Sequence, residues 1–264
     1  MTQSDGRNYK VPVVLSIAGS DNTGGAGIQA DIKTCCAFKV YAATVVTAIT
    51  AQNSHGVKSV EYVGREMLID QIETLLNDYR PDAVKIGMLP NPEAVEVVAD
   101  AIARHLLPNV VFDPVIRATA ADASLSGETG KTARAMVDCL FPLCTVITPN
   151  IPEYEYFTSE FDLHCFRKAK AMLLKGGHGD CVNCVDRLHL FGSAPREFVY
   201  SANKIDTRHT HGTGCVLSSA IACGLAKGEN IPSAVGHAKK FVDEAIRKGA
   251  EFPVTENYGP LYLF

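Results

Sequence analysis

The sequence lacks the features that would place the protein in a membrane or on a nucleic acid. No apolar run among its 264 residues reaches the roughly 18 residues expected of a membrane span. The first ten residues are polar and contain no apolar stretch of the kind that a secretory signal needs. The formal net charge is −4, so no basic field favours nucleic acid or an acidic membrane. These absences predict a cytoplasmic protein that binds neither.

A second absence concerns paired metal ligands. Nine cysteines are present, but their number is odd and they are scattered along the chain. Cys181 and Cys184 have the spacing of a zinc-ligand pair, and His178 and His189 lie nearby. A closed zinc site usually needs a second pair at similar spacing, and the sequence contains none. We therefore expect reduced thiols and no structural zinc.

Low-complexity linkers and internal repeats are also absent, so residues 1–264 are predicted to form one domain. Short apolar runs alternate with segments of helical length. The predicted strands cover residues 11–17, 44–49, Ala83–Ile86, Val110–Phe112, 145–148 and 172–174. One predicted helix begins near Gly27, and two others cover residues 65–79 and 92–106. Residues 181–204 are typical of a β-hairpin or a meander. Alternating strands and helices indicate an α/β fold with a mostly parallel sheet.

Polar or glycine-rich segments directly follow six of these strands. They are residues 19–27, 52–56, 87–89, 113–115, 149–153 and 176–178. Because the carboxyl ends of parallel strands meet at one edge of a sheet, we expect the ligand site at that edge.

Residues 19–27, the first glycine turn, lead from a strand into a helix. Glycine lets the backbone approach a ligand closely, and a helix N-terminus attracts anions. The segment is not a Walker loop, because no Gly-Lys-Ser/Thr follows it. Taken alone, it fits a tight strand-to-helix turn as well as a binding loop.

Residues 211–215, His-Gly-Thr-Gly-Cys, open another predicted helix. The two glycines, Gly212 and Gly214, leave backbone N–H groups free at the positive end of the helix dipole, which suits an anion hole for a phosphoryl group in transfer. Cys215 follows in the first turn, where the helix field favours the thiolate and would lower its pKa. Such a thiolate could accept the proton of an attacking hydroxyl. The alternative is a small buried residue that packs the helix onto the sheet.

Asn150, Glu153 and Lys175 carry the groups that Mg-ATP requires. The Asn and Glu oxygens can hold Mg²⁺ or its waters, and lysine offers a positive charge to phosphate oxygens. The Asn-x-x-Glu pattern is also typical of a helix start with an acidic first turn.

Taken together, these segments resemble the hydroxymethylpyrimidine/phosphomethylpyrimidine kinase family of the ribokinase-like superfamily. The similar motifs, in the family's order, are residues 17–31, 48–53, 85–89, 113–115, 147–153, 175–178 and 210–215. The resemblance extends from about residue 13 to about residue 259. It implies a three-layer α/β/α sandwich with a mostly parallel central sheet, and a homodimer.

The activity that the resemblance implies is an ATP- and Mg²⁺-dependent phosphotransfer in thiamine biosynthesis. The acceptor would be 4-amino-5-hydroxymethyl-2-methylpyrimidine and then its monophosphate. A pyridoxal kinase on the same fold and a non-catalytic pyrimidine-binding module are the alternatives. The amide of Gln52 suits an aminopyrimidine edge, which favours the pyrimidine over pyridoxal. Ring binding alone would not need the phosphate-side residues, which favours an enzyme.

The resemblance also implies roles for individual residues. The substrate would contact Gly19, Ala26, Asp31, Gln52, Met88, Val115 and His211. The nucleotide would contact Asn150, Glu153, Lys175, Gly212 and Gly214, and the metal Asp113 and Glu153. Catalysis would use Gly212, Thr213, Gly214, Lys175 and Cys215, the last in the place of the aspartate base of sugar-kinase relatives.

Two segments depart from the family pattern. Only twenty-one residues separate Glu153 from Lys175, where the family usually has a longer helix, turn and strand. Residues 116–122 replace a loop that usually contains glycine. Arg117 in that loop could contact phosphate, although we favour a solvated side chain.

Overall fold

The computed structural model describes residues 10–116, 129–162, 164–176 and 183–264. In these ranges nine strands form one mixed sheet in the order β3-β2-β1-β4-β5-β6-β7-β8-β9. The strands are β1 (Val13–Asp21), β2 (Tyr41–Asn53), β3 (Gly56–Tyr62), β4 (Ala83–Ile86), β5 (Val110–Phe112), β6 (Val146–Ile147), β7 (Ala171–Leu174), β8 (Asn183–Leu190) and β9 (Arg196–Asn203). The six central strands, in the order β2-β1-β4-β5-β6-β7, pair in parallel. Strand β3 at one edge and strands β8 and β9 at the other pair antiparallel.

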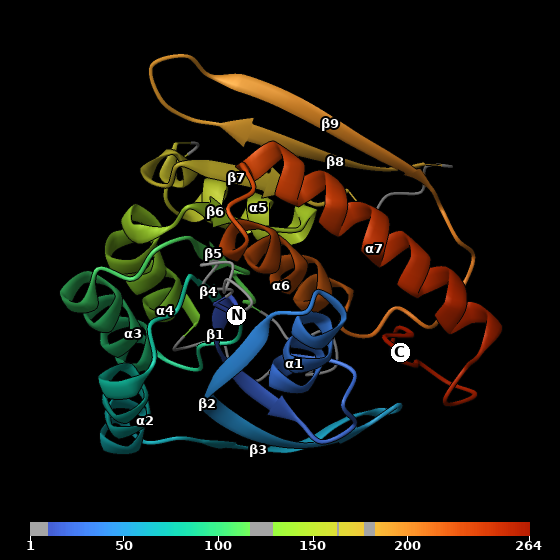
Figure 1. Cartoon of the computed structure of the whole chain (residues 1–264), viewed down its shortest axis with the longest axis horizontal. Coiled ribbons are helices and arrows are strands. Elements are labelled where there is room, and N and C mark those ends of the chain that lie inside the picture. The colour runs from blue at the N-terminus through green and yellow to red at the C-terminus, as the bar shows by residue number, and fades with distance from the viewer. Residues whose placement is uncertain (1–9, 117–128, 163, 177–182) are drawn as a thin grey trace, which may run out of the picture.

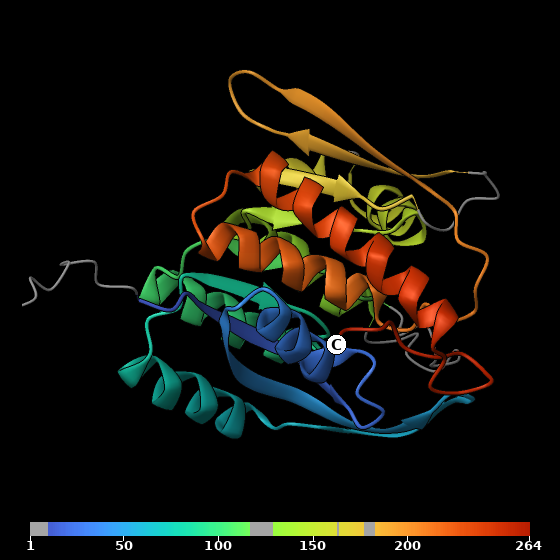
Figure 2. The ribbon, with the colours of Figure 1, turned by 45° about the vertical axis from the view of Figure 1, so that its right-hand side comes forward.

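Helices cover both faces of the sheet (Figures 1 and 2). They are α1 (Gly27–Ala37), α2 (Arg65–Asp78), α3 (Pro92–His105), α4 (Thr129–Ala135), α5 (Ile151–Glu160), α6 (Thr213–Ala226) and α7 (Ile231–Glu251). Helices α1, α6 and α7 share one hydrophobic cluster, and α2 to α5 share the other. The protein therefore has the three-layer, ribokinase-like α/β arrangement that the sequence predicts.

The central strands are apolar on both sides because each side faces a helical layer. Val14 packs in the cluster beneath α1 and α6, whereas its neighbours Leu15 and Ile17 belong to the opposite cluster. Val111 and Phe112 on β5 divide in the same way. This alternation follows from the two-residue period of a strand, and short unbroken apolar runs are typical of buried parallel strands.

Helix α6 is buried on all sides. All ten residues from position 216 to position 225 are buried, and the helix lies between the sheet and α7 (Figure 1). A helix that is apolar all round suits such a central position. Its N-terminus is consequently held by packing along the whole helix, and it lies at the edge of the sheet where the predicted motifs converge.

The structure confirms the predicted order of strands and helices but corrects several bounds, since β1 continues to Asp21, inside the predicted glycine turn, and β2 begins at Tyr41. The bounds of β4 and β5 match the prediction, and the expected hairpin is present as β8 and β9. The loop predicted at residues 52–56 is shorter than expected, because β2 continues to Asn53 and β3 begins at Gly56. The short segment before Lys175 contains α5, a 3₁₀ turn at Cys165–Lys168 and β7. Among the described helices, none is both long and apolar enough to span a membrane.

Candidate active site

The carboxyl ends of β1, β4, β5, β6 and β7 meet the N-terminus of α6, as the sequence predicts. Asp113 follows β5, and its carboxylate accepts a hydrogen bond from Lys175 after β7, with Nζ 2.6 Å from Oδ1. Asn150 after β6 forms a parallel bridge with Lys175. A Cβ added at Gly214 would lie 3.0 Å from Asp113 Oδ2 and 3.4 Å from Lys175 Nζ. The start of α6 therefore faces this ion pair directly.

Lys175 and Asp113 form a nearly buried ion pair. Burial works to lower the pKa of Lys175, but the carboxylates of Asp113 and Glu153 outweigh it, and the pKa is raised. Lys175 therefore carries a full positive charge at neutral pH. The Thr148 hydroxyl also contacts Asp113, with Oγ1 3.2 Å from Oδ1. These groups place a fixed positive charge and a carboxylate beside the helix N-terminus.

Glu153 and Asn150 form the capping box of α5. The Asn150 side chain accepts from the Glu153 N–H, and the Glu153 carboxylate accepts from the Asn150 N–H, both at 2.8 Å. The helix-start interpretation of Asn-x-x-Glu is therefore correct. Burial, assisted by Asp113 and opposed by Lys175, raises the pKa of Glu153 to about 7. Two carboxylates thus share a nearly dry corner with one lysine.

The predicted anion hole lies at the start of α6. Gly212 is the N-cap with a φ of +84°, and a Cβ there would overlap the carbonyl oxygen of Gly25. Because α6 begins at Thr213, the N–H groups of Gly214 and Cys215 have no carbonyl one turn earlier in the helix. Thr213, which the resemblance includes in the catalytic loop, does not contribute a free N–H group, because its N–H donates to the Thr210 carbonyl at 3.3 Å.

Cys215 is half-buried in the first turn of α6, and its pKa shifts opposite to the prediction. Burial raises the pKa of this thiol, and the carboxylates of Asp31 and Asp113 add to the rise. Lys85 and the N–H of Gly27 act in the other direction. The expected lowering is wrong because loss of hydration outweighs the favourable charges around the sulfur.

The first glycine turn is tied to the segment before α6. Asp21 accepts hydrogen bonds from the backbone N–H groups of Thr23 and Ala26 and from His211, whose Nε2 lies 2.8 Å from Oδ2. Burial opposes these bonds, but together they hold the pKa of Asp21 well below its usual range. The His211 ring also meets Tyr258, with the ring centroids 5.4 Å apart. His211 therefore joins the first glycine turn to the C-terminal segment.

Three of the residues predicted to hold the ring, Ala26, Gln52 and Met88, lie in or beside this turn. A Cβ on Gly19 would lie 2.9 Å from Met88 Cε, so Met88 packs against the bare glycine. Ala26, Gln52, Met88 and Val115 are all half-buried. Gln52 is near the end of β2, and its backbone N–H donates to Asn22 Oδ1 at 2.8 Å.

Comparison with known proteins identifies the family. The model of the phosphomethylpyrimidine kinase family matches residues 21–262. The chain belongs to this family.

Known phosphomethylpyrimidine kinases resemble the chain over nearly its whole length. It is 39% identical to the hydroxymethylpyrimidine/phosphomethylpyrimidine kinase of Rhizobium meliloti, covering 96% of this chain and 97% of that one. Identity to the enzyme of the same name from Streptomyces coelicolor is 42%, covering 95% and 93%.

Solved structures of two kinds share the fold. The pyridoxal kinase of Bacillus subtilis in complex with ADP superposes with a TM-score of 0.83 at 33% identity, covering 96% of this chain and 97% of that one. The phosphomethylpyrimidine kinase of Clostridium difficile superposes with a TM-score of 0.73 at 35% identity, covering 90% and 100%.

In this member of the phosphomethylpyrimidine kinase family, the Asp31 side chain is buried more deeply than a residue that contacts a ligand would be. Its side chain is 1% exposed and accepts hydrogen bonds from Ser16 and Ser219 and from Lys85, whose Nζ is 2.8 Å from Oδ2. The pair lies behind the first glycine turn. Sequence reasoning assigned no role to Lys85 or Asp21. Lys85 could have been noticed because it is a lysine within the short apolar strand Ala-Val-Lys-Ile. Asp21 could have been noticed because it is an aspartate that ends a strand before a glycine turn.

Some predicted features cannot be placed. His178, Cys181 and Arg117 lie outside the described residues. The eight described cysteines, which include Cys184, are free thiols. Within the described ranges, no group of three or more His, Cys, Asp and Glu side chains is arranged to hold a metal ion.

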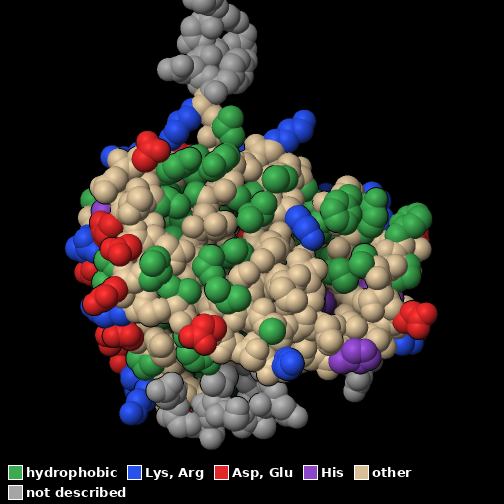
Figure 3. Space-filling model, turned by 90° about the horizontal axis from the view of Figure 1, so that it is seen from below, with side chains coloured by type: hydrophobic (Ala, Val, Ile, Leu, Met, Phe, Trp, Pro, Cys, Tyr) green, Lys and Arg blue, Asp and Glu red, His purple; other side chains and the backbone are tan. Residues whose placement is uncertain are grey.

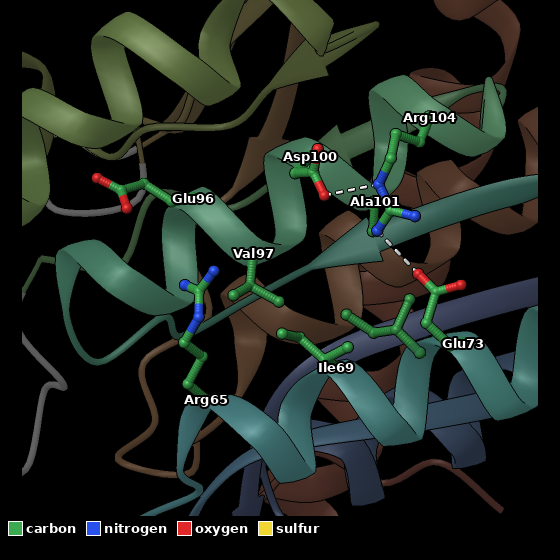
Figure 4. A pocket seen from close by; sticks show the side chains of 9 residues that line it. Arg65, Ile69, Glu73, Glu96, Val97, Asp100, Ala101 and Arg104 are labelled. Carbon is green, nitrogen blue, oxygen red and sulfur yellow. Dashed lines mark hydrogen bonds and ion pairs between the residues drawn. The ribbon is translucent and has the colours of Figure 1, made fainter.

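A surface hollow between α2 and α3 lies away from this site (Figure 4). Arg104 crosses it, with Nε 2.7 Å from Asp100 Oδ2 and Nη2 2.9 Å from Glu73 Oε1. Ile69 and Val97 contribute apolar lining. None of the predicted site residues lines it, so its charged groups serve to join the two helices.

Proposed function

We propose that the protein transfers the γ-phosphoryl group of ATP to the hydroxymethyl group of 4-amino-5-hydroxymethyl-2-methylpyrimidine, and then phosphorylates the monophosphate. The observation that carries the proposal is the meeting of the α6 N-terminus, Lys175 and Cys215 at one edge of the sheet. Membership of the phosphomethylpyrimidine kinase family supplies the substrate class.

On the phosphate side, charge and position supply the catalysis. The backbone N–H groups of Gly212, Gly214 and Cys215 would donate to the anionic group in transfer. Lys175 would turn its ammonium from Asp113 toward the phosphates when ATP binds. Phosphoryl transfer needs mainly such positioning and charge stabilisation.

Asp113 and Glu153 are suited to hold Mg²⁺, with Asn150 beside them. They are oxygen donors, which magnesium prefers. Burial, together with the nearby Asp113 carboxylate, raises the pKa of Glu153, so a cation at this corner would stabilise the ionised carboxylates. When bound, Mg²⁺ would neutralise phosphate charge.

Cys215 would act as the base. Its thiolate takes the proton from the hydroxymethyl oxygen, and that oxygen forms a bond to the γ-phosphorus. The bond between the γ-phosphorus and ADP breaks, and ADP leaves with the bonding electrons. Gly19, Ala26, Met88 and Val115 would hold the ring, with Gln52 on its amino edge and His211 bordering it. Asp31 would support these residues from behind rather than touch the ring.

Pyridoxal is the second candidate substrate. Pyridoxal kinases superpose with TM-scores of up to 0.83, above the 0.73 of the phosphomethylpyrimidine kinase structure. An ADP-release assay with the pyrimidine alcohol, its monophosphate and pyridoxal, each at several concentrations, separates the candidates. We expect kcat/KM to be highest for the pyrimidines. A higher value for pyridoxal would reverse the assignment, and no turnover with any of them would refute it.

We also infer a homodimer that uses the surface over β2, β3 and α2. Hydrophobic side chains gather on the face that is seen from below (Figure 3). The exposed apolar residues of these elements are Tyr41, Ile49, Val60, Tyr62 and Met67, of which Ile49 is 56% exposed and Met67 58%. Light scattering should give twice the monomer mass, and Ile49→Asp should reduce it to the monomer mass. A monomeric wild type would refute the inference.

A further inference from the structure

Lys85 is a fully buried lysine in the middle of β4. Its side chain is 0% exposed, and Asp31 on α1 is its ion-pair partner. Ala83 belongs to the cluster beneath α1 and α6, whereas Val84 and Ile86 belong to the opposite one. By the two-residue period of the strand, Lys85 faces α1 and α6. Burying this ion pair costs hydration free energy, and an apolar pair of similar volume would often be at least as stable.

The Lys85–Asp31 pair is connected to the start of α6. Asp31 Oδ1 accepts a hydrogen bond from Ser219 Oγ at 2.7 Å. Cys215 lies four residues before Ser219, one turn nearer the N-terminus on the same face of the helix. Lys85 also reaches toward the site, because a Cβ added to Gly87 would lie 3.0 Å from its Nζ. The buried pair is therefore bonded to α6 one helical turn deeper in the core than Cys215.

Several charged or titratable groups interact electrostatically with the Cys215 thiol. They are Asp31 on α1, Lys85 on β4, Asp113 after β5, Lys175 after β7 and Tyr258 in the C-terminal segment. Of the two lysines, Lys175 is paired with Asp113 and would turn to the phosphates of ATP. Lys85 has no exposed surface, and its ion pair with Asp31 holds it inside the core. It is the fixed positive charge on the protein side of the sulfur.

We propose that Lys85 is a positioning residue that stabilises the thiolate of Cys215 from inside the core, and that Asp31 limits this effect while it anchors α6 through Ser219. The proposal rests on the proposed role of Cys215 as the base. Burial makes the thiolate scarce, and Lys85 opposes burial more than any other neighbour does. A cation there favours the charged form without occupying space that the substrate needs.

The test measures the acidity of Cys215 without using catalysis. The full chain is alkylated with iodoacetamide from pH 6 to pH 11, and the Cys215 peptide is quantified by mass spectrometry. Because only the thiolate reacts, the midpoint of the rate profile reports acidity, and the plateau at high pH reports access. In Lys85→Met the midpoint should rise by about 1 pH unit or more. In Asp31→Asn, which keeps the shape of the side chain, the midpoint should fall.

The opposite signs separate a charge effect from a packing defect. Lys85→Met combined with Asp31→Asn removes both charges and should bring the midpoint back toward the wild type. Should Lys85→Met fail to fold, Asp31→Asn alone decides. An unchanged or raised midpoint in Asp31→Asn would overturn the proposal, as would an unchanged midpoint in a folded Lys85→Met.

The pH profile of kcat distinguishes this inference from the proposed mechanism. It should shift in the same direction as the alkylation midpoint in each variant. A shifted alkylation midpoint with an unshifted kcat profile would remove Cys215 from proton transfer and refute the proposed mechanism. The same result would support the action of Lys85 on Cys215, because alkylation does not depend on the kinase reaction.

Discussion

Replacement of Glu153 by Gln should change how stability depends on pH. The pKa of Glu153 is raised from 4.5 to about 7, and its side chain is buried. Below pH 4.5 the folded and unfolded chains both hold the proton. Between pH 4.5 and pH 7 the unfolded chain releases it while the folded chain keeps it, so rising pH favours unfolding. At about 1.4 kcal/mol per pH unit, this loss approaches about 3 kcal/mol by pH 8.

Glutamine removes the titration and keeps the cap. Its side-chain oxygen can still accept from the Asn150 N–H, because Gln serves in a capping box as Glu does. The free energy of unfolding of Glu153→Gln minus that of the wild type should therefore become more positive by up to about 3 kcal/mol from pH 4.5 to pH 8. Other groups titrate in both proteins and cancel from this difference.

Urea unfolding at several pH values measures the difference, with chelator present and nucleotide absent. Glu155→Gln is the matched control, because Glu155 is exposed on the same helix. Its difference from the wild type should not change with pH. Parallel pH curves for Glu153→Gln and the wild type would show that burial does not govern this carboxyl and would refute the reasoning.

Three further predictions concern the site. Gln52→Leu should weaken pyrimidine binding by about 1–3 kcal/mol in calorimetry, and unchanged binding would place the ring elsewhere. Cys215→Ala should lower kcat by about 10²- to 10⁴-fold, and Cys215→Asp should recover part of that rate. The kcat of the wild type should rise from pH 6 to pH 9. A near wild-type rate in the alanine variant would leave Cys215 only a packing role. Gly212→Ala should destabilise the fold more than Gly228→Ala in thermal unfolding. Both glycines have a φ near +85°, but only at Gly212 would the new Cβ meet backbone, so equal losses would contradict the contact with Gly25.

The sequence predicted the elements and the motifs better than their surroundings. The strands at residues 83–86 and 110–112 were predictable because short apolar runs between turn signals leave little choice of register. The sign of the Cys215 pKa shift was not, because it depends on burial by segments distant in the sequence. The ion pair between Asp31 and Lys85 joins residues 54 positions apart, and no local sequence pattern predicts it. The hydrogen bond from the Thr213 N–H to the Thr210 carbonyl was not predictable either, because it depends on the backbone conformation of the turn before α6 and not on the spacing of the motif.

The contacts between the first glycine turn, α1 and the start of α6 have a consequence for synthesis of the chain. Asp21 meets His211 across 190 residues, and Asp31 meets Ser219 across 188. The turn that would hold the substrate leaves the ribosome about 190 residues before the segment that supports it. Non-local contacts of this kind form late, since the intervening chain must be ordered first. A nascent chain can therefore assemble most of its sheet before it has a site to bind the ring.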